Sequence, residues 1–316
     1  MGGEVVNKMS ESIGALQAVM LLISAAGIVN HVIIIPLLLQ TAGRDSWVAA
    51  LLALFPLLCW IALLFVIMKR TKQEHLFLWF KKRVGPVVAW ILFLAIAFEL
   101  FLMSLLTTRD LTYWANITYL PKTPNTVIVA AFAIVSFYSA HSGLRSIAIV
   151  NGILLPFVVL FGWFVALSNI PNKDYSLLFP ILQDGLAPVY RGMLYSFAGS
   201  MTVFLILLMQ HRIHSKTKLW HLLVAGIIMV NLTISPLTGA IAEFGPVEAA
   251  RQRFPAYEEW RLITFGHFLE HVDFLSIYQW LVGGFVRVSL AMMLIPEIFH
   301  IPKGKIRSGL LALLYA

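Results

Sequence analysis

The chain has 316 residues, of which 60% are hydrophobic and only 12% are charged, and its mean hydropathy is +0.86. Soluble domains are about 45–50% apolar and about 25% charged, so this chain lacks the polar residues that would cover a soluble surface. Intrinsic disorder is excluded because it requires low hydrophobicity. A disulfide scaffold is excluded because Cys59 is the single cysteine. The composition therefore predicts a polytopic membrane protein.

Eight apolar segments are each long enough for a membrane-spanning helix, which needs about 20 residues. They are too long and too uniformly apolar for barrel strands, which alternate apolar and polar residues, so we predict an all-α fold. A ninth apolar segment begins near Ser308 and runs to Ala316. The predicted spans are residues 13–39, 46–68, 87–108, 125–141, 146–168, 186–210, 219–242 and 274–299.

The basic residues are concentrated in the loops that follow the second, sixth and eighth spans. The net charge of +8 therefore reflects the positive-inside rule rather than nucleic-acid binding, and it predicts a cytoplasmic N-terminus. The long segment 243–273 then lies on the outer side, where we expect a short helix at the membrane surface. The basic loops contain Lys69, Arg70, Lys72, Lys81, Lys82, Arg83, Arg212, Lys216, Lys218, Lys303, Lys305 and Arg307.

The first and sixth spans are interrupted in a similar way. Ser24, Ala25, Ala26 and Gly27 precede Asn30-His31 and Pro36 in the first span, and the sixth carries Ser196-Phe197-Ala198-Gly199-Ser200. Many transporters place two broken helices at equivalent positions of inverted repeats and bind their substrate at the breaks. Small residues at these positions are equally expected in close helix packing. A binding site and a packing contact are both compatible with the pattern.

Four groups of residues resemble a known family in their order and spacing. On these residues the chain resembles the B subunits of nutrient germinant receptors of endospore-forming bacteria, a family of the amino acid–polyamine–organocation transporter superfamily. The resemblance covers residues 12–300. The groups are Gln40–Trp47 (QTAGRDSW), Arg109-Asp110 with Leu120–Pro124 (LPKTP), Leu178–Gly185 (LFPILQDG), and Phe254-Pro255 with Glu270–Asp273, Trp280 and Arg287.

The resemblance implies a ten-helix fold like that of the leucine transporter, with the ligand between helices one, three, six and eight. Residues 13–168 would form the first five-helix repeat and residues 186–316 a second, incomplete repeat, because the chain ends early in the ninth helix. The resemblance also implies a complex with a larger A subunit and a lipoprotein C subunit in the spore inner membrane. One departure is Ser200, which stands where the family often has an acidic residue.

Two ionisable residues lie deep inside predicted spans. Glu99 is about twelve residues into the third span, and Arg287 is about thirteen residues into the eighth. Each charge would cost about 2.5–3.5 kcal/mol at the centre of a spanning helix, so we predict that the two side chains either pair or line one water-filled cavity. Arg287 could then hold a ligand carboxylate, and Glu99 could bind an ammonium group or a proton. A buried ion pair that only fixes helix packing is the alternative.

The segment His267-Phe268-Leu269-Glu270-His271 matches the H-x-x-E-H pattern of an inverted zinc-protease motif. Catalytic zinc needs a third protein ligand and an open position, and Asp273 and Glu297, the acids downstream, are poorly placed to serve. We therefore predict no metal, no cofactor and no enzyme activity.

The sequence favours a nutrient-sensing subunit of a spore germinant receptor that binds a small nutrient, most simply an amino acid. The predicted ligand-binding residues are Ala25, Ala26, Gly27, Glu99, Phe197, Gly199, Ser200 and Arg287. A proton-coupled amino-acid transporter of the same superfamily is the alternative, and a membrane zinc protease is a third hypothesis.

Overall fold

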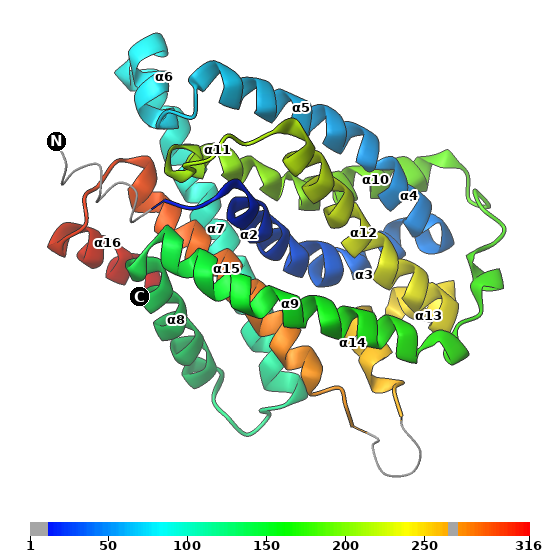
Figure 1. Cartoon of the computed structure of the whole chain (residues 1–316). Helices are drawn as coiled ribbons and strands as arrows, with labels where there is room; N and C mark the ends of the chain where they lie inside the picture. The colour runs from blue at the N-terminus through cyan, green and yellow to red at the C-terminus, as the bar shows by residue number, and fades with distance from the viewer. Residues whose placement is uncertain (1–11, 265–270) are drawn as a thin grey trace.

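The computed structural model describes residues 12–264 and 271–316, and regular secondary structure in this part of the chain is entirely helical (Figure 1). Within the described residues, eight helical stretches are long and apolar enough to cross a membrane. The predicted all-α polytopic class is confirmed. The only strand-like feature among these residues is an isolated parallel bridge between Ile13 and Ile213, which connects the start of the first span to the loop after the sixth.

The described helices follow one another with short connections. Their bounds are α2 Ala15–Ile28, α3 Ile35–Ala42, α4 Ser46–Leu52, α5 Leu54–Thr71, α6 Leu76–Val84, α7 Pro86–Thr118, α8 Asn125–Ser142, α9 Leu144–Ser168, α10 Leu186–Ser200, α11 Leu205–Met209, α12 Leu219–Phe244, α13 Pro246–Arg251, α14 Pro255–Arg261, α15 Leu275–Ile298 and α16 Lys305–Tyr315.

Helix α15 lies at the centre of the bundle. Of its most apolar window, 83% is buried, against 17% in α8 and in α9, so those two helices are peripheral. It packs against α7, α2, α9 and α8, whereas α2 also contacts α12. Because α15 is surrounded on several sides, its side chains must be satisfied by protein partners rather than by lipid or water.

The first predicted span changes its helical type in the middle. Helix α2 continues through Ser24–Gly27, and a π-helical segment, η1 (Val29–Ile33), separates it from α3, which has Pro36 in its first turn. The small residues stay α-helical, because a run of Ala and Gly packed at a helix contact keeps its hydrogen bonds. The irregularity falls at Asn30-His31, which the sequence pattern also placed in the interruption. Figure 1 shows α2 and α3 running in one direction before α4 and α5 return.

The sixth predicted span is irregular at a comparable place. Helix α10 continues through Ser200, a 3₁₀ segment η5 (Met201–Phe204) follows, and α11 completes the span. As in the first span, the helix is not unwound, and the irregular turn follows the predicted small residues. Both spans therefore have a non-α turn near mid-length, which is a common feature of functional sites.

The segment 243–273 contains two short helices in its described part, α13 and α14, rather than one. Helix α14 packs against α12, α3 and η1, and Tyr257, Glu259 and Trp260 on it are buried. Helix α14 is therefore packed against the spans through its aromatic side chains, and its position at the membrane surface stays a prediction.

Glu259 belongs to a buried charge cluster at this end of the bundle. Its carboxylate lies against Gly239 of α12, where an added Cβ would come within 2.6 Å of Oε2. Glu243 is also buried, and its Oε1 is 3.5 Å from Lys173 Nζ. Within the described residues, Lys173 therefore forms its ion pair with Glu243 and not directly with Glu259. Burial and the negative charge of Glu243 raise the pKa of Glu259 well above its usual range, and Lys173 opposes this only in part.

We predict that Glu259 makes the stability of the protein depend on pH. A raised pKa in the folded state means that its contribution is complete below about pH 4.3, the unfolded value. That contribution is lost as the pH rises through the folded value. Glu259→Gln stays neutral, so its melting temperature in detergent should be less sensitive to pH between 5 and 8 than that of the wild type. Glu258→Gln is the control, because Glu258 is partly exposed and pairs with Arg261 at 2.9 Å. Equal pH dependence in wild type and Glu259→Gln would contradict the assignment.

Candidate functional site

Arg287 is the charged side chain at the middle of the central helix. It is 9% exposed and makes three hydrogen bonds to neutral oxygens of three other segments. Its Nη1 donates to the carbonyl of Ala25 in α2 at 2.7 Å and to Oγ1 of Thr202 in η5 at 3.2 Å. Its Nε donates to Oγ1 of Thr107 in α7 at 3.1 Å. One guanidinium thus joins the first, third, sixth and eighth spans.

The two hydroxyl groups are oriented to accept from Arg287. Thr107 Oγ1 donates its own hydrogen to the Met103 carbonyl at 2.7 Å, and Thr202 Oγ1 donates to the Gly199 carbonyl at 3.2 Å. Within the described residues, Nη2 of Arg287 takes part in no hydrogen bond. The site therefore keeps a positive charge with a remaining donor, which is the chemistry that recognises an anionic group.

A second polar contact joins the irregular turns of the first and sixth spans. Asn30 Nδ2 in η1 donates to Ser200 Oγ at 3.0 Å and to the Met229 carbonyl in α12 at 3.1 Å. Gly199 makes this approach possible, since a Cβ there would lie 2.8 Å from Asn30 Oδ1 and 2.9 Å from Ile34 Cδ1. The absence of a side chain at Gly199 lets the two spans meet.

The hydrogen-bond partner of His31 is a backbone carbonyl that a proline leaves free. Pro236 lies inside α12 and has no N–H, so it cannot bond to the carbonyl of Leu232 four residues earlier. His31 Nδ1 lies 3.1 Å from that carbonyl oxygen. Because a carbonyl can only accept, Nδ1 is the protonated nitrogen of the ring.

A small cavity extends from Thr107 toward the end of the bundle that carries α13 and α14. It is lined by η1, α7 and α15 residues together with Arg253 and Phe254, and it encloses about 20 Å³, enough for about one water molecule. At its rim, Arg253 Nη2 is 3.8 Å from Asp110 Oδ1. Trp280 also lines the cavity and stacks on Trp114, with ring centroids 3.9 Å apart. In this conformation the cavity beside Thr107 is too small for a ligand larger than water.

The structure brings four of the predicted site residues into one polar network. Ala25 and Arg287 are bonded directly, Gly199 is connected through Thr202, and Ser200 contacts Asn30 next to them. Ala26 is buried beside Ala25, whereas Gly27 and Phe197 are partly buried and take no part in these polar contacts among the described residues. Their role in ligand binding stays a prediction.

Glu99 is not part of this network. Its side chain is exposed on α7, and in the described part of the chain it forms no ion pair with Arg287, although its charge acts on Arg287 over a longer distance. Its role as a ligand residue also stays a prediction.

Sequence analysis did not identify Thr107 and Thr202 as site residues. Threonine is frequent in membrane helices, where its hydroxyl bonds back to the carbonyl four residues earlier, so a single threonine carries little information. The one signal in the sequence was that each threonine lies close to a predicted site residue on the same span. Thr202 is two residues after Ser200, at the irregular turn, and Thr107 is on the same span as Glu99.

The zinc-protease hypothesis cannot be placed on this structure, because His267 and Glu270 lie outside the described residues. Among the residues that are described, no group of three His, Cys, Asp or Glu side chains is close enough to hold a metal ion.

Comparison with known proteins identifies the relatives of this chain. A family model described as "Spore germination protein" matches residues 12–315. The chain belongs to this family. It is 44% identical over 299 residues to "Spore germination protein XB" of Bacillus anthracis, covering 94% of this chain and 84% of that protein. It is also 21% identical over 264 residues to "Putative spore germination protein YfkT" of Bacillus subtilis, covering 82% of this chain and 71% of that protein.

Membership of the spore germination family agrees with both the sequence motifs and the helical membrane fold. The family is a germination-related, permease-like class of membrane proteins, and the eight apolar helices fit that description. The recognition based on the four groups of residues is confirmed.

We predict that Gly199→Ala destabilises the contact between the first and sixth spans. The added methyl group would meet Asn30 and Ile34 in a closely packed region, so overpacking should cost about 1–3 kcal/mol. Gly152→Ala is the matched control, because an added Cβ there meets nothing within 4 Å and alanine favours a helix over glycine. Thermal denaturation of the purified proteins in detergent measures both changes. An unchanged midpoint for Gly199→Ala would show that the two spans can separate freely at this point.

Proposed function

We propose that this protein is the nutrient-sensing membrane subunit of a spore germinant receptor and that it binds a small nutrient, an amino acid, beside Arg287. The observation that carries the proposal is the buried guanidinium, which joins four spans through neutral oxygens and keeps Nη2 without a partner among the described residues. A carboxylate is the natural ligand for such a donor, since charge-assisted hydrogen bonds are about twice as strong as neutral ones.

The mechanism we propose is a population shift between two arrangements of the irregular spans. A ligand shifts such an equilibrium only by its differential affinity for the two states. The cavity above Thr107 holds about one water molecule, so an amino acid requires an arrangement in which η1, α7 and the Arg253–Asp110 rim are farther apart. Because Arg287 contacts α2, α7 and η5 at once, a carboxylate bound to it would change the relative positions of these segments.

The exposed face of α7 supports assembly with partner subunits. Glu99 lies within the span Pro86–Thr118 yet is exposed on this chain, beside exposed Leu94 and Phe98. An ionisable side chain facing lipid costs several kcal/mol, so such residues are expected to face protein or water. We propose that this face meets the germinant receptor A subunit in the spore inner membrane, with the lipoprotein C subunit as a further member of the complex.

We predict that Arg287→Met strongly weakens the nutrient response but leaves the protein folded. Methionine is long and apolar, so it fills much of the volume of the arginine side chain, and the hydroxyls of Thr107 and Thr202 keep their bonds to helix carbonyls. Loss of a charge-assisted contact worth about 1.5–3 kcal/mol should raise the nutrient concentration for half-maximal response by about ten- to one-hundred-fold. The measurement is the germination response of spores carrying the variant, with the amount of protein in the membrane determined in parallel.

Arg191→Met is the matched control, because Arg191 is exposed on α10. A normal response of spores carrying Arg287→Met would refute the proposed site. Uptake of labelled amino acid into proteoliposomes containing this protein alone would instead favour the transporter hypothesis.

A further inference from the structure

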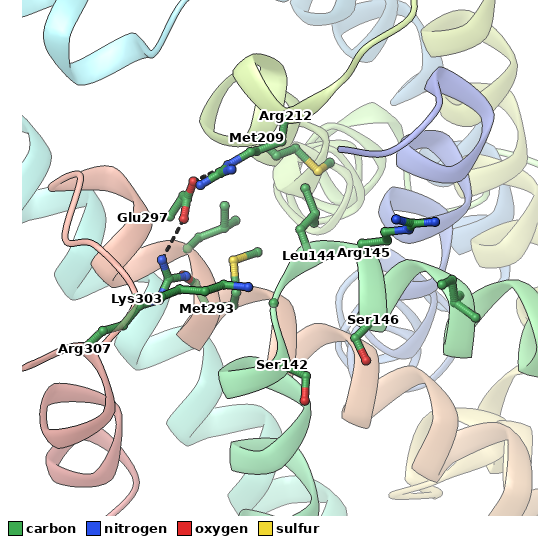
Figure 2. Close-up of a pocket in the computed structure, with 13 residues that line it drawn as sticks. Ser142, Leu144, Arg145, Ser146, Met209, Arg212, Met293, Glu297, Lys303 and Arg307 are labelled. Atoms are coloured by element: carbon green, nitrogen blue, oxygen red, sulfur yellow. Dashed lines mark hydrogen bonds and ion pairs between the residues drawn. The ribbon is translucent and has the colours of Figure 1, made fainter. Parts of the chain in front are cut away.

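A second cavity lies at the opposite end of the bundle, where the loops are rich in lysine and arginine. It encloses about 300 Å³ between the corner that joins α8 to α9, the end of the sixth span, the end of α15, and α16 (Figure 2). It shares no lining residue with the cavity above Thr107. Its charged lining residues are Arg145, Arg212, Lys303, Arg307 and Glu297.

Glu297 holds two of these basic side chains in fixed positions. Arg212 Nε is 2.6 Å from Glu297 Oε1, and Arg307 Nη1 is 2.9 Å from Oε2. Figure 2 shows the two arginines reaching the carboxylate from different helical segments. Among the described residues, four basic side chains and one carboxylate line the cavity, a formal excess of three positive charges.

The wall opposite Glu297 is the N-terminus of a long helix. Gly143 precedes α9 with a φ of +96° and gives the helix no side-chain cap, so the first amides of α9 require other partners. Lys303 extends to this corner, with Nζ 3.5 Å from the position that a Cβ of Gly143 would occupy (Figure 2). Ser146, in the same first turn, also lines the cavity. A helix N-terminus with basic side chains around it is a favourable anion site.

One buried donor in the lining has no partner among the described residues. Arg307 is 5% exposed, and within residues 12–264 and 271–316 its buried Nε has no hydrogen-bond partner. A buried polar atom without a partner costs about 1–3 kcal/mol, and an anion or its water shell in the cavity would relieve that cost. This observation is independent of the helix terminus and of the surface charges.

We infer that this cavity binds a phosphate group, with the first turn of α9 and Lys303 on one side and the arginines fixed by Glu297 on the other. Several N–H donors from different directions suit the three-dimensional set of oxygens on a phosphate better than a planar carboxylate. The volume corresponds to about ten water molecules, which leaves room for a phosphate ester rather than the inorganic ion alone. The phosphate can belong to a lipid headgroup or to a soluble compound.

The test compares Arg145→Gln/Lys303→Gln with Lys81→Gln/Lys82→Gln in the full chain. All four residues are exposed, so both variants should fold and both lose two positive charges at the same end of the protein. Thermal stability in detergent is measured with inorganic phosphate, with glycerol phosphate, and with sodium chloride at the same ionic strength. Native mass spectrometry of protein reconstituted with phosphatidylglycerol or phosphatidylcholine reports retained lipid.

We expect a phosphate compound, but not chloride, to raise the melting temperature of the wild type, and the Kd to rise at least ten-fold in Arg145→Gln/Lys303→Gln only. Retention of phosphatidylglycerol that this variant loses would identify a lipid headgroup as the source of the phosphate. Stabilisation by glycerol phosphate without retained lipid would identify a soluble ester. Equal behaviour of the two variants, or neither stabilisation nor retained lipid in the wild type, would overturn the inference.

Discussion

The arrangement of the bundle depends on a single buried cation. A guanidinium at the centre of a membrane protein is costly unless its donors find oxygen atoms, and Arg287 finds them on α2, α7 and η5. These three segments can all reach Arg287 only if they surround α15 in a particular order and if each turns the right face toward it. Arg287 therefore adds directional contacts between four spans to the apolar packing that forms the bundle, in which one apolar side chain can replace another at many helix contacts.

The middle and the C-terminal end of α15 bury charged side chains in different ways. At mid-helix the charge of Arg287 is solvated by neutral oxygens, and no carboxylate of the described residues lies at bonding distance. Near the C-terminal end, Glu297 is surrounded by Arg212, Arg307 and His211, the last at 3.0 Å. The positive charge of Arg287 therefore stays available for a ligand. The negative charge of Glu297 is paired with the arginines and holds their side chains in place. The two residues are ten positions apart, which is about 15 Å along an α-helix.

Hydropathy was sufficient to predict the spans, because an apolar segment of about 20 residues has few alternatives to a helix in a bilayer. It could not predict the site of the irregular turns, since the π segment at Val29–Ile33 depends on partners far away in the sequence, Ser200 and the carbonyls of α12. Glu99 and Arg287 were predicted to meet because both lie near the middle of a span, but the direction of each side chain around its helix also matters. Glu99 and Thr107 are eight residues apart on α7, so at about 100° per residue their side chains point about 80° apart. The sequence predicted a short helix at the membrane surface in segment 243–273, and its mixture of charges gave no sign that Glu259 on α14 would be buried.

The missing N–H of Pro236 determines which nitrogen of a distant imidazole carries the proton. With Nδ1 of His31 donating to the free carbonyl of Leu232, the other ring nitrogen of the neutral side chain has a lone pair and can only accept. The first span therefore presents an acceptor on His31, while the eighth presents a donor on Arg287. A proline in one helix thus fixes the hydrogen-bonding polarity of a side chain in another.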